Sequence, residues 1–236
     1  MVLHKEHSFS IFFGDATNCT VAHQAPEFKD SCQELCKSLA LKNLVLDHQT
    51  HSATGFFIDK NTVLNEPVIL FERDGDFLIT DQPRVGIGVL TADCLPVIIY
   101  DTKNNIIAIA HAGWKGSVAE ISIKVIEAML SRVFFKPQDL KIFFGPSAKK
   151  CCYEVQPDFL THLEKCSFKS SLIEQRDNKL FFDNPLINKL QLIGLGIKPD
   201  QIDMSMNLCT MCSPNFHSFR IKKTANVCQT TLAWLK

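Results

Sequence analysis

The stretch that decides the fold reads Pro96-Val-Ile-Ile-Tyr-Asp-Thr-Lys-Asn-Asn-Ile-Ile-Ala-Ile-Ala110. Its two ends, Pro96–Tyr100 and Ile106–Ala110, are apolar and rich in β-branched residues, and the polar segment Asp101–Asn105 joins them. Two strand-forming runs with a short polar connection are typical of a β-hairpin. The sequence therefore predicts an antiparallel strand pair at this place.

The register of this hairpin places two reactive side chains near each other. If Tyr100 pairs with Ile106, the numbers of facing residues sum to about 206, and Cys94 faces residue 112. A slip of one residue places Cys94 opposite His111. We therefore expect Cys94 and His111 to lie close together at the open end of the hairpin.

Apolar runs of strand length recur along the rest of the chain, and helical periodicity is less frequent. The further predicted strands are Ser10–Phe13, Leu44–Leu46, Val68–Phe71, Phe77–Thr80, Val85–Leu90, Lys141–Phe144, Ile202–Met206 and Phe216–Arg220. The predicted helices are Lys29–Leu41, Ser117–Val133 with Ser117 as its N-cap, Pro157–Lys165, Asn184–Leu195 and Thr224–Leu235. Clustered strands among fewer helices predict a single α+β domain, residues 1–236, in which helices cover mixed sheets.

Composition and charge exclude several classes of protein. With 46% hydrophobic and 21% charged residues, the chain has enough apolar surface to fold, which excludes disorder as its main state. Its 25 basic and 25 acidic residues cancel, whereas proteins that bind the nucleic-acid backbone usually carry a basic excess. No apolar run approaches the ~18 residues of a membrane span, and Met1–Ser8 lacks the apolar core of a signal peptide. We therefore expect a cytoplasmic protein that binds neither nucleic acid nor membranes, and no protein partner is predictable.

The ten cysteines are irregularly spaced, so a cytoplasmic chain is expected to keep them reduced, most of them as small buried residues. One pair, Cys209-Thr-Met-Cys212, has the CxxC spacing. Outside a thioredoxin-like context, a redox or metal-binding role for this pair is the less favoured interpretation.

Cys94 and His111 are the strongest candidates for chemistry. A thiolate and an imidazole side by side serve either as a nucleophile with its base or as two metal ligands. The alternative is a buried cysteine near a histidine at a strand end. Gly113 and Gly116 favour a functional role, because glycines just before a helix leave backbone N–H groups exposed for an anion. A plain turn before a helix has the same pattern.

Five sequence blocks follow one another from about residue 40 to the C-terminus. They are Gln49-Thr-His-Ser52, Thr91-Ala-Asp-Cys-Leu-Pro-Val97, Ala108-Ile-Ala-His-Ala-Gly-Trp-Lys-Gly116, Gly145-Pro-Ser-Ala-Lys-Lys-Cys-Cys-Tyr-Glu-Val155, and Asp183–Gly196 with Cys209-Thr210 and Phe216–Arg220. Together they resemble the laccase-domain family. Its members are also known as multicopper polyphenol oxidase-like proteins and as peptidoglycan editing factors, and purine nucleoside phosphorylase activity is associated with them.

The resemblance implies an α/β/β/α sandwich of mixed sheets and a metal site. The family's His, Cys and His ligands correspond to His51, Cys94 and His111, and three protein ligands leave a fourth position open, as in a catalytic zinc site. Zinc is the expected cofactor, and copper is less favoured. The implied catalytic residues are Cys94, His111 and Asp93, and the implied substrate- or phosphate-binding residues are Gln49, Gly113, Lys115, Cys152 and Arg220.

The chain departs from the family pattern at several positions. The family's Trp-Arg-Gly is Trp114-Lys-Gly116 here, which keeps the charge but loses the bidentate guanidinium. Its Tyr-Arg-Arg-Asp-Gly becomes Phe219–Lys223, in which Arg220 is the matching arginine. Its N-terminal Arg-x-Gly-Gly-Val-Ser becomes Gly14–Cys19. If the lost positions hold phosphate or ribose, activity is weakened or altered.

The resemblance implies a zinc-dependent purine nucleoside phosphorylase. Phosphate and a purine nucleoside (adenosine, inosine or methylthioadenosine) give the free base and ribose 1-phosphate, with adenosine deamination as a side activity. One alternative is a cysteine amidase or peptidoglycan-editing hydrolase with Cys94 as nucleophile and His111 as base. Another is a binding protein that has lost turnover. Laccase chemistry is least favoured, because it needs more paired histidine ligands than the 8 His of this chain provide.

Overall fold

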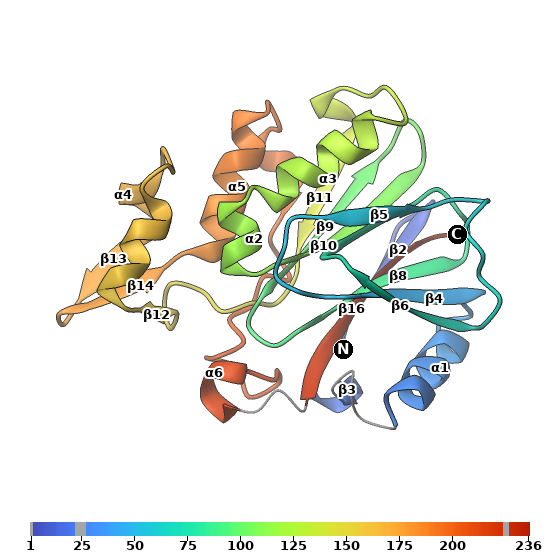
Figure 1. The fold of residues 1–236 in the computed structure, drawn as a ribbon, viewed down its shortest axis with the longest axis horizontal. Coiled ribbons are helices and arrows are strands. Elements are labelled where there is room, and N and C mark those ends of the chain that lie inside the picture. The colour runs from blue at the N-terminus through green and yellow to red at the C-terminus, as the bar shows by residue number, and fades with distance from the viewer. Residues whose placement is uncertain (1, 22–26, 224–226) are drawn as a thin grey trace.

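The predicted hairpin forms the centre of one β-sheet (Figure 1). In the computed structural model, which describes residues 2–21, 27–223 and 227–236, β9 (Leu95–Asp101) pairs with β10 (Ile106–Ala112). The strand order of this first sheet is β15-β11-β9-β10-β7-β5. Its other strands are β5 (Gly55–Ile58), β7 (Phe77–Thr80), β11 (Leu140–Phe144) and β15 (Ile202–Asp203), the last shorter than the predicted Ile202–Met206. The outer pairs β11–β15 and β5–β7 are parallel and the inner pairs antiparallel, so the sheet is mixed.

The register of the hairpin is shifted by one residue from the prediction. Asp101, not Tyr100, faces Ile106. The Asp101 carboxylate accepts hydrogen bonds from the backbone N–H groups of Lys103 and Asn104, at 2.9 and 3.2 Å, and so closes a shorter turn. An aspartate side chain that replaces a backbone acceptor in this way stabilises a tight turn, and this lets its own backbone join the strand pair.

The second sheet contains both ends of the described chain and has the order β1-β2-β16-β8-β4-β6, with β3 also beside β16. β4 pairs parallel with β6 and β8, and the remaining pairs are antiparallel. The strands are β1 (Val2–Lys5), β2 (Phe9–Phe13), β3 (Cys19–Val21), β4 (Asn43–His48), β6 (Val68–Asp74), β8 (Val85–Thr91) and β16 (Val227–Leu235).

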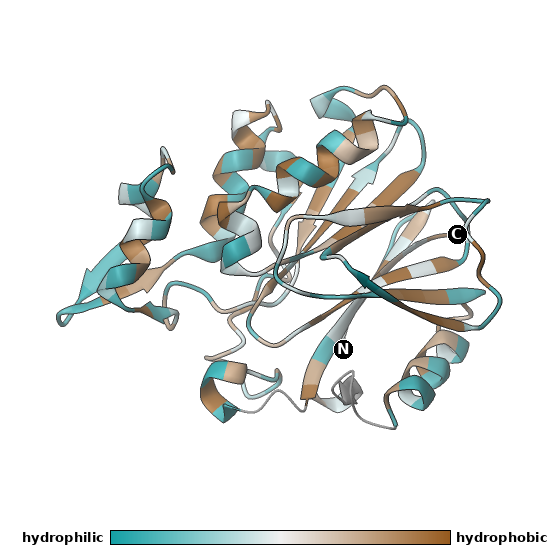
Figure 2. Cartoon of the chain, viewed as in Figure 1, coloured by the Kyte–Doolittle hydropathy of each residue, from teal (hydrophilic) through white to brown (hydrophobic). Residues whose placement is uncertain are grey.

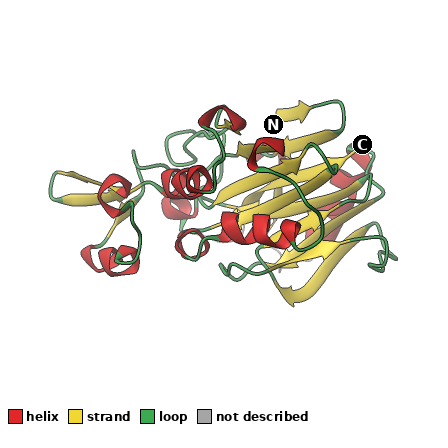
Figure 3. Ribbon diagram, turned by 90° about the horizontal axis from the view of Figure 1, so that it is seen from above, coloured by secondary structure: helices red, strands yellow, loops and turns green. Residues whose placement is uncertain are grey.

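The two sheets pack face to face, and helices cover their outer faces (Figures 1 and 3). The core between the sheets is apolar, as the colouring of the strands in Figure 2 shows, and includes Ile11, Val45, Ile87, Ile98 and Ile109. α3 (Ile121–Leu130) and α5 (Asn184–Gly194) cover the first sheet, and α1 (Phe28–Ser38) covers the second. This arrangement confirms the expected α/β/β/α sandwich with mixed sheets.

A side lobe, residues 153–182, projects from the sandwich on the left of Figure 1. Its small sheet has the order β12-β14-β13. The elements are β12 (Glu154–Val155), α4 (Lys169–Leu172), β13 (Ile173–Arg176), β14 (Lys179–Phe182) and a 3-10 helix, Pro157–Leu163, where Pro157–Lys165 was predicted to be helical. Tyr153, Phe159 and Phe182 form the apolar core of the lobe.

The predicted single helix that starts at Ser117 is two helices. α2 (Trp114–Val118) ends early, and α3 begins after Glu120, whose φ of 63° is left-handed. The break is stabilised by a side chain of another helix, because Gln191 Nε2 donates a hydrogen bond of 2.9 Å to the carbonyl of Ser117. Ser117 therefore lies inside α2, and its predicted role as an N-cap is wrong.

Two predictions near the C-terminus are wrong. The predicted helix Thr224–Leu235 is the strand β16, apart from residues 224–226, which lie outside the described residues. β16 is buried on both faces between β2 and β8, and a strand of this kind lacks the polar–apolar alternation that distinguishes it from a helix. The predicted strand Phe216–Arg220 is a turn that leads into α6 (Phe219–Lys222), because the Ser218 hydroxyl caps this helix.

The remaining 3-10 helices are Ala16–Asn18, Pro137–Asp139 and Pro199–Gln201. Among the residues that the structure describes, no helix combines the length and the apolar character that crossing a membrane requires.

Candidate active site

Three side chains that commonly ligate metals meet at one end of the sandwich. His51 follows β4, Cys94 lies between β8 and β9, and His111 lies on β10. Their ligand atoms all lie within 4.8 Å of one another, and Cys94 Sγ is 3.8 Å from His51 Nε2. The structure therefore brings together Cys94 and His111, as the hairpin predicted, and adds His51 as the resemblance implied.

Gly113 makes this close approach possible. A Cβ atom on Gly113 would lie 2.7 Å from His51 Cδ2 and 3.2 Å from Cys94 Sγ, and any larger residue would displace these side chains. Gly116 has a similar constraint, because its Cβ would lie 2.8 Å from the backbone oxygen of Ser52. The two glycines that the sequence suggested as an anion cradle thus have a packing reason of their own.

Asp76 organises the site, although no sequence pattern pointed to it. This buried carboxylate lies 2.8 Å from His111 Nδ1 and accepts hydrogen bonds from the backbone N–H groups of Thr50, His51 and Ser52. The Ser52 hydroxyl donates a further bond of 2.7 Å. Asp76 therefore fixes the His51 loop and the His111 ring together. In the sequence it is one of three acids in Glu72-Arg-Asp-Gly-Asp76, just before the predicted strand Phe77–Thr80, so no spacing or motif distinguishes it.

The electrostatics of the site favour ionised groups. Burial would raise the pKa of Asp76, but hydrogen bonds from His111 and Ser52 outweigh it and lower the pKa to about 2. Burial would also raise the pKa of the Cys94 thiol, and the imidazoles of His111 and His51 lower it to about 6. Burial would lower the pKa of His111, but the Cys94 thiolate and Asp76 raise it to about 9. Near neutral pH these shifts favour the Cys94 thiolate, the form that metal ligation requires, beside a protonated His111, whose proton a metal ion would displace.

The donor set fits a metal ion. Asp76 occupies His111 Nδ1, which leaves Nε2 as the ligand atom, and a carboxylate behind a ligating imidazole is the usual second partner in metal sites. His51 offers Nε2, which lies 3.8 Å from Cys94 Sγ. Two imidazoles and a thiolate could therefore hold one ion, and three protein ligands would leave a coordination position for another molecule.

A cavity of about 900 Å³ lies over these three side chains and includes them in its lining. This volume is typical of pockets for small organic ligands. Aromatic rings of Trp114, Tyr153 and Phe219 form part of its wall, and Arg220 and Lys223 bring positive charge. An apolar wall combined with a few charged groups suits a ligand that has both a flat ring and an anionic part.

Asp93, an expected catalytic residue, lines the cavity but uses its carboxylate to hold the C-terminal segment. Oδ1 accepts a 2.6 Å bond from Thr210 Oγ1, and Oδ2 accepts 2.9 Å bonds from Ser218 Oγ and the Arg220 backbone N–H. The Arg220 guanidinium stacks on the Tyr153 ring, 4.1 Å from its centroid. Asp93 therefore positions Arg220 in the wall of the cavity. Tyr153 lies in a block that resembles the family, but no role was predicted for it from the sequence.

The other expected substrate-binding residues are placed differently. Gln49 lines the cavity, but its amide makes both a donor and an acceptor hydrogen bond with the backbone of Leu90, so it braces β8. Lys115 is exposed, with Nζ 5.8 Å from the Trp114 ring centroid, and is not part of the cavity lining.

Cys152 is also outside the cavity lining. It lies in a four-cysteine cluster made of Cys151, Cys152, Cys209 and Cys212. Burial would raise the pKa of Cys209 in this cluster, but backbone N–H groups, first that of Lys149, lower it to about 7. The cluster therefore contains a thiol that ionises readily.

Comparison with known proteins places these features in a family. A family model described as multi-copper polyphenol oxidoreductase laccase matches residues 10–236. A purine nucleoside phosphorylase of Clostridium acetobutylicum is 29% identical over 221 residues, which cover 93% of this chain and 88% of that protein. A protein named adenosine deaminase RL5, from an unknown prokaryotic organism, is 31% identical over 178 residues, covering 73% of this chain and 67% of that protein.

Among solved structures, the hypothetical protein YfiH of Bacillus licheniformis matches with a TM-score of 0.84. The match covers 97% of this chain and 93% of that chain, at 23% sequence identity. A likeness at this identity concerns the fold, and it agrees with the sandwich described above.

Proposed function

The chain belongs to the multi-copper polyphenol oxidoreductase laccase family, and from this premise we propose that it is a zinc-dependent purine nucleoside phosphorylase. The observation that carries the proposal is the His51, Cys94 and His111 set, with a coordination position left over, in the lining of a cavity of about 900 Å³. A purine nucleoside phosphorylase is similar over 93% of the chain. In this reaction a phosphate oxygen bonds to C1′ of adenosine, inosine or methylthioadenosine, the bond from C1′ to the purine breaks, and the base leaves with the electron pair.

Zinc is the ion that the donor set favours. Imidazole and thiolate ligands together suit Zn²⁺, and catalytic zinc sites commonly have three protein ligands. A zinc ion held here would act as a Lewis acid toward an oxygen or nitrogen atom of the substrate. Asp76 serves the ion indirectly, because it fixes the ring of His111 and the backbone of His51.

Arg220 is proposed to bind phosphate. Its guanidinium is held in the cavity wall by the Tyr153 ring and by a 2.6 Å hydrogen bond from Nη1 to the backbone oxygen of Glu154. A planar guanidinium held in this way has lost part of its rotational freedom before phosphate arrives, so less entropy is lost on binding. Positioning of phosphate against C1′ would supply much of the rate, because the reaction joins two separate molecules.

Lys115 is the second proposed phosphate contact, although it is exposed beside Trp114. A lysine ammonium is a point charge and orients phosphate less tightly than an arginine. We therefore expect a raised phosphate requirement in this protein. Lys115→Arg should lower that requirement if Lys115 contacts phosphate, and should leave it unchanged if Arg220 alone does.

Deamination of adenosine is a second candidate function. The relative named adenosine deaminase RL5 is 31% identical over 73% of this chain. The coordination position that remains beside His51, Cys94 and His111 also suits hydrolytic deamination, in which water adds to C6 of the adenine ring and ammonia leaves.

The deciding experiment measures products as a function of phosphate. The zinc-loaded protein is incubated with adenosine, inosine or methylthioadenosine at several phosphate concentrations, and the sugar 1-phosphate, free base and ammonia are quantified. The proposal expects ribose 1-phosphate from adenosine and inosine, and 5-methylthioribose 1-phosphate from methylthioadenosine, in equal amount to the base and at a rate that rises with phosphate. Base release that does not depend on phosphate would contradict it in favour of nucleoside hydrolysis.

Two variants complete this experiment. Cys94→Ala should abolish turnover, and Cys166→Ser, which changes a cysteine outside the cavity lining, should retain it. If no nucleoside is consumed, the proposal fails; a binding protein becomes the better account when zinc is bound at Cys94, and an amidase with a Cys94 nucleophile when it is not. Zinc content separates the amidase, because a ligated thiolate is blocked from attack.

A further inference from the structure

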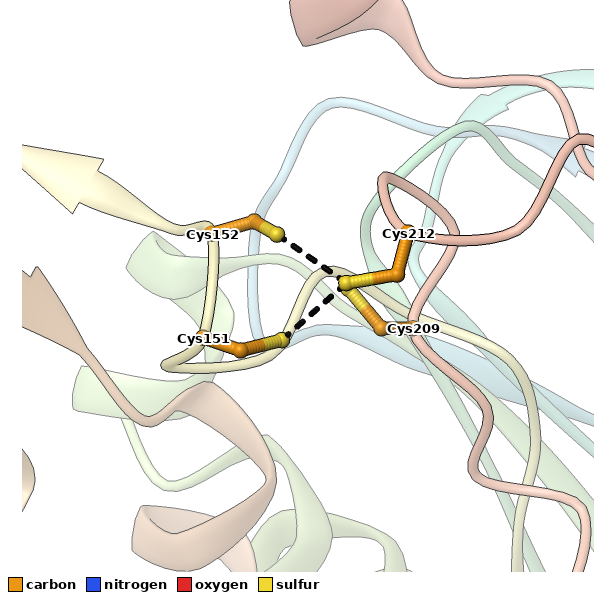
Figure 4. A group of neighbouring side chains, drawn as sticks. All are labelled: Cys151, Cys152, Cys209 and Cys212. Carbon is orange, nitrogen blue, oxygen red and sulfur yellow. Dashed lines mark hydrogen bonds between the residues drawn. The ribbon is translucent and has the colours of Figure 1, made fainter.

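The four-cysteine cluster gathers two distant parts of the chain. Cys151 and Cys152 lie in the turn before β12, and Cys209 and Cys212 lie in the loop between β15 and α6 (Figure 4). All four sulfurs lie within 4.8 Å of one another. Cys152 Sγ is 3.1 Å and Cys151 Sγ 3.5 Å from Cys212 Sγ, and Figure 4 shows both side chains pointing toward the CxxC pair.

Backbone hydrogen bonds build this cluster. Ser147 N–H donates to the carbonyl of Leu208, and Thr210 N–H donates back to the carbonyl of Ser147, so the two segments pair as a short parallel bridge. On the far side, Arg176 Nη2 donates to the carbonyls of Lys150 and Cys151, at 2.7 and 3.1 Å. The positions of the sulfurs therefore follow from a fixed main chain and do not depend on the thiols alone.

The spacing of the sulfurs suits a single metal ion. A tetrahedral zinc–thiolate centre has Zn–S distances of about 2.3 Å, which puts neighbouring sulfurs roughly 3.8 Å apart. A disulfide, in contrast, brings two sulfurs to about 2.05 Å and would leave the other two cysteines of the cluster without a reason to converge. We propose that Cys151, Cys152, Cys209 and Cys212 form a second zinc site, separate from the His51, Cys94 and His111 set.

Charge and access agree with this site. A zinc ion with four thiolates carries two negative charges, and Lys149, Lys150 and Arg176 lie on the segments that surround it, the last two also paired with Glu174. Cys151 and Cys212 are exposed, so an ion can enter from solvent. Four protein ligands leave no position for a substrate, which is the pattern of structural zinc sites.

The site would tie together two walls of the cavity. Cys152 precedes Tyr153, whose ring supports Arg220, and Cys209 precedes Thr210, whose hydroxyl donates to Asp93. A zinc ion between them would hold the start of the side lobe against the loop that leads to α6. The ion would therefore stabilise the proposed phosphate-binding wall without touching the substrate.

Zinc content tests the proposal on the full-length protein. After purification with a phosphine reductant and exchange into metal-free buffer, we expect two zinc ions per chain. The double variant Cys209→Ser/Cys212→Ser should bind one ion fewer than the wild type, and the matched control Cys166→Ser should bind as many as the wild type. This difference of one ion tests the four-cysteine site whether or not the His51, Cys94 and His111 set holds zinc. Cys94→Ala removes the zinc of that set independently. An equal zinc content in the double variant and the wild type would overturn the proposal.

Two measurements keep the test valid if the double variant fails to fold. In Cys94→Ala loaded with Co²⁺, the four-cysteine site should give intense thiolate-to-cobalt charge-transfer absorption, and a spectrum without it would overturn the proposal. In the wild type, alkylation with N-ethylmaleimide followed by peptide mass analysis should show the four cysteines protected until a chelator removes zinc. Disulfide-linked peptides from this cluster in place of zinc, or copper or iron in its place, would also refute the zinc assignment.

Discussion

Replacing Asp76 with asparagine tests whether the candidate metal ligands depend on one buried carboxylate. The side chain is 1% exposed, and the two residues have nearly the same shape. On one side, Oδ1 accepts a backbone bond from His51 and lies 2.8 Å from His111 Nδ1, and on the other, Oδ2 accepts bonds from the backbone and the hydroxyl of Ser52. An asparagine amide has one acceptor and one donor, so in either orientation its NH₂ group faces hydrogen-bond donors.

The magnitude follows from these contacts. At least two buried hydrogen bonds are lost, and each unsatisfied buried group costs ~1–3 kcal/mol, so the free energy of unfolding should fall by ~2–6 kcal/mol. The His111 ring also loses the carboxylate that fixes its orientation. Removal of such a partner typically weakens metal binding by ~10–100-fold, and we expect a loss of zinc affinity in this range.

Two assays separate these effects. Competition with a chromophoric chelator gives the zinc affinity, and urea unfolding of the metal-free protein gives the stability. Asp74→Asn is the matched control. Among the described ion pairs, the exposed Asp74 carboxylate contacts only the exposed His48 ring, so both the zinc affinity and the stability should stay close to wild type. A folded Asp76→Asn variant with wild-type zinc affinity would refute the reasoning.

Three further predictions follow from single residues. Gly113→Ala should reduce zinc content and kcat at least ~10-fold, with a smaller effect on the free energy of unfolding, because the new Cβ would lie 2.7 Å from His51 Cδ2. Full zinc occupancy in this variant would contradict the prediction. Arg220→Gln should raise the KM for phosphate ~10-fold, about 1.4 kcal/mol, and leave that for the nucleoside nearly unchanged; steady-state kinetics that show the opposite split would place phosphate elsewhere. Burial raises the pKa of Asp47 from 3.8 to about 6, so the folded state holds this proton more tightly, and the stability it contributes is present at low pH and is lost as pH rises through about 6. The free energy of unfolding of Asp47→Asn, relative to that of the wild type, should therefore be ~2 kcal/mol higher at pH 7 than at pH 4 in urea unfolding. An equal difference at the two pH values would contradict this prediction.

Local sequence signals predicted much of the fold. The strand at Phe77–Thr80 and the helix that begins at Asn184 have the predicted start, because turn and capping residues bound them clearly. The hairpin was one residue out of register, because Asp101 closes the turn with its side chain. Where a segment is buried on both faces, as in β16, periodicity no longer separates strand from helix, and the tertiary position decides.

The site could be predicted only in part for the same reason. Cys94 and His111 are neighbours through one hairpin, and this relation is local. His51 lies on the connection from β4 to β5, far in sequence from the hairpin, so no spacing argument reaches it, and the family resemblance supplied it. Asp76 acts through hydrogen bonds to three consecutive backbone N–H groups, and this partnership exists only in the folded chain. The CxxC pair likewise shows its partners, Cys151 and Cys152, only in three dimensions.

Two of the three ligands lie on connections that cross from one sheet to the other, and this has a mechanical consequence. His51 lies on the connection from β4 of one sheet to β5 of the other, Cys94 lies on the connection from β8 to β9, which also crosses between the sheets, and His111 lies on β10, so the ligand triangle straddles the seam of the sandwich. The distances among the three ligands therefore depend on the thickness of the apolar layer between the sheets, which includes Ile98 and Val89. Metal coordination tolerates errors of only ~0.2 Å, whereas a folded core can absorb the loss of a methyl group. Substitutions in that layer can therefore leave the protein folded and still change the distances among the three ligand atoms. The packing between the two sheets thus sets the geometry of the site.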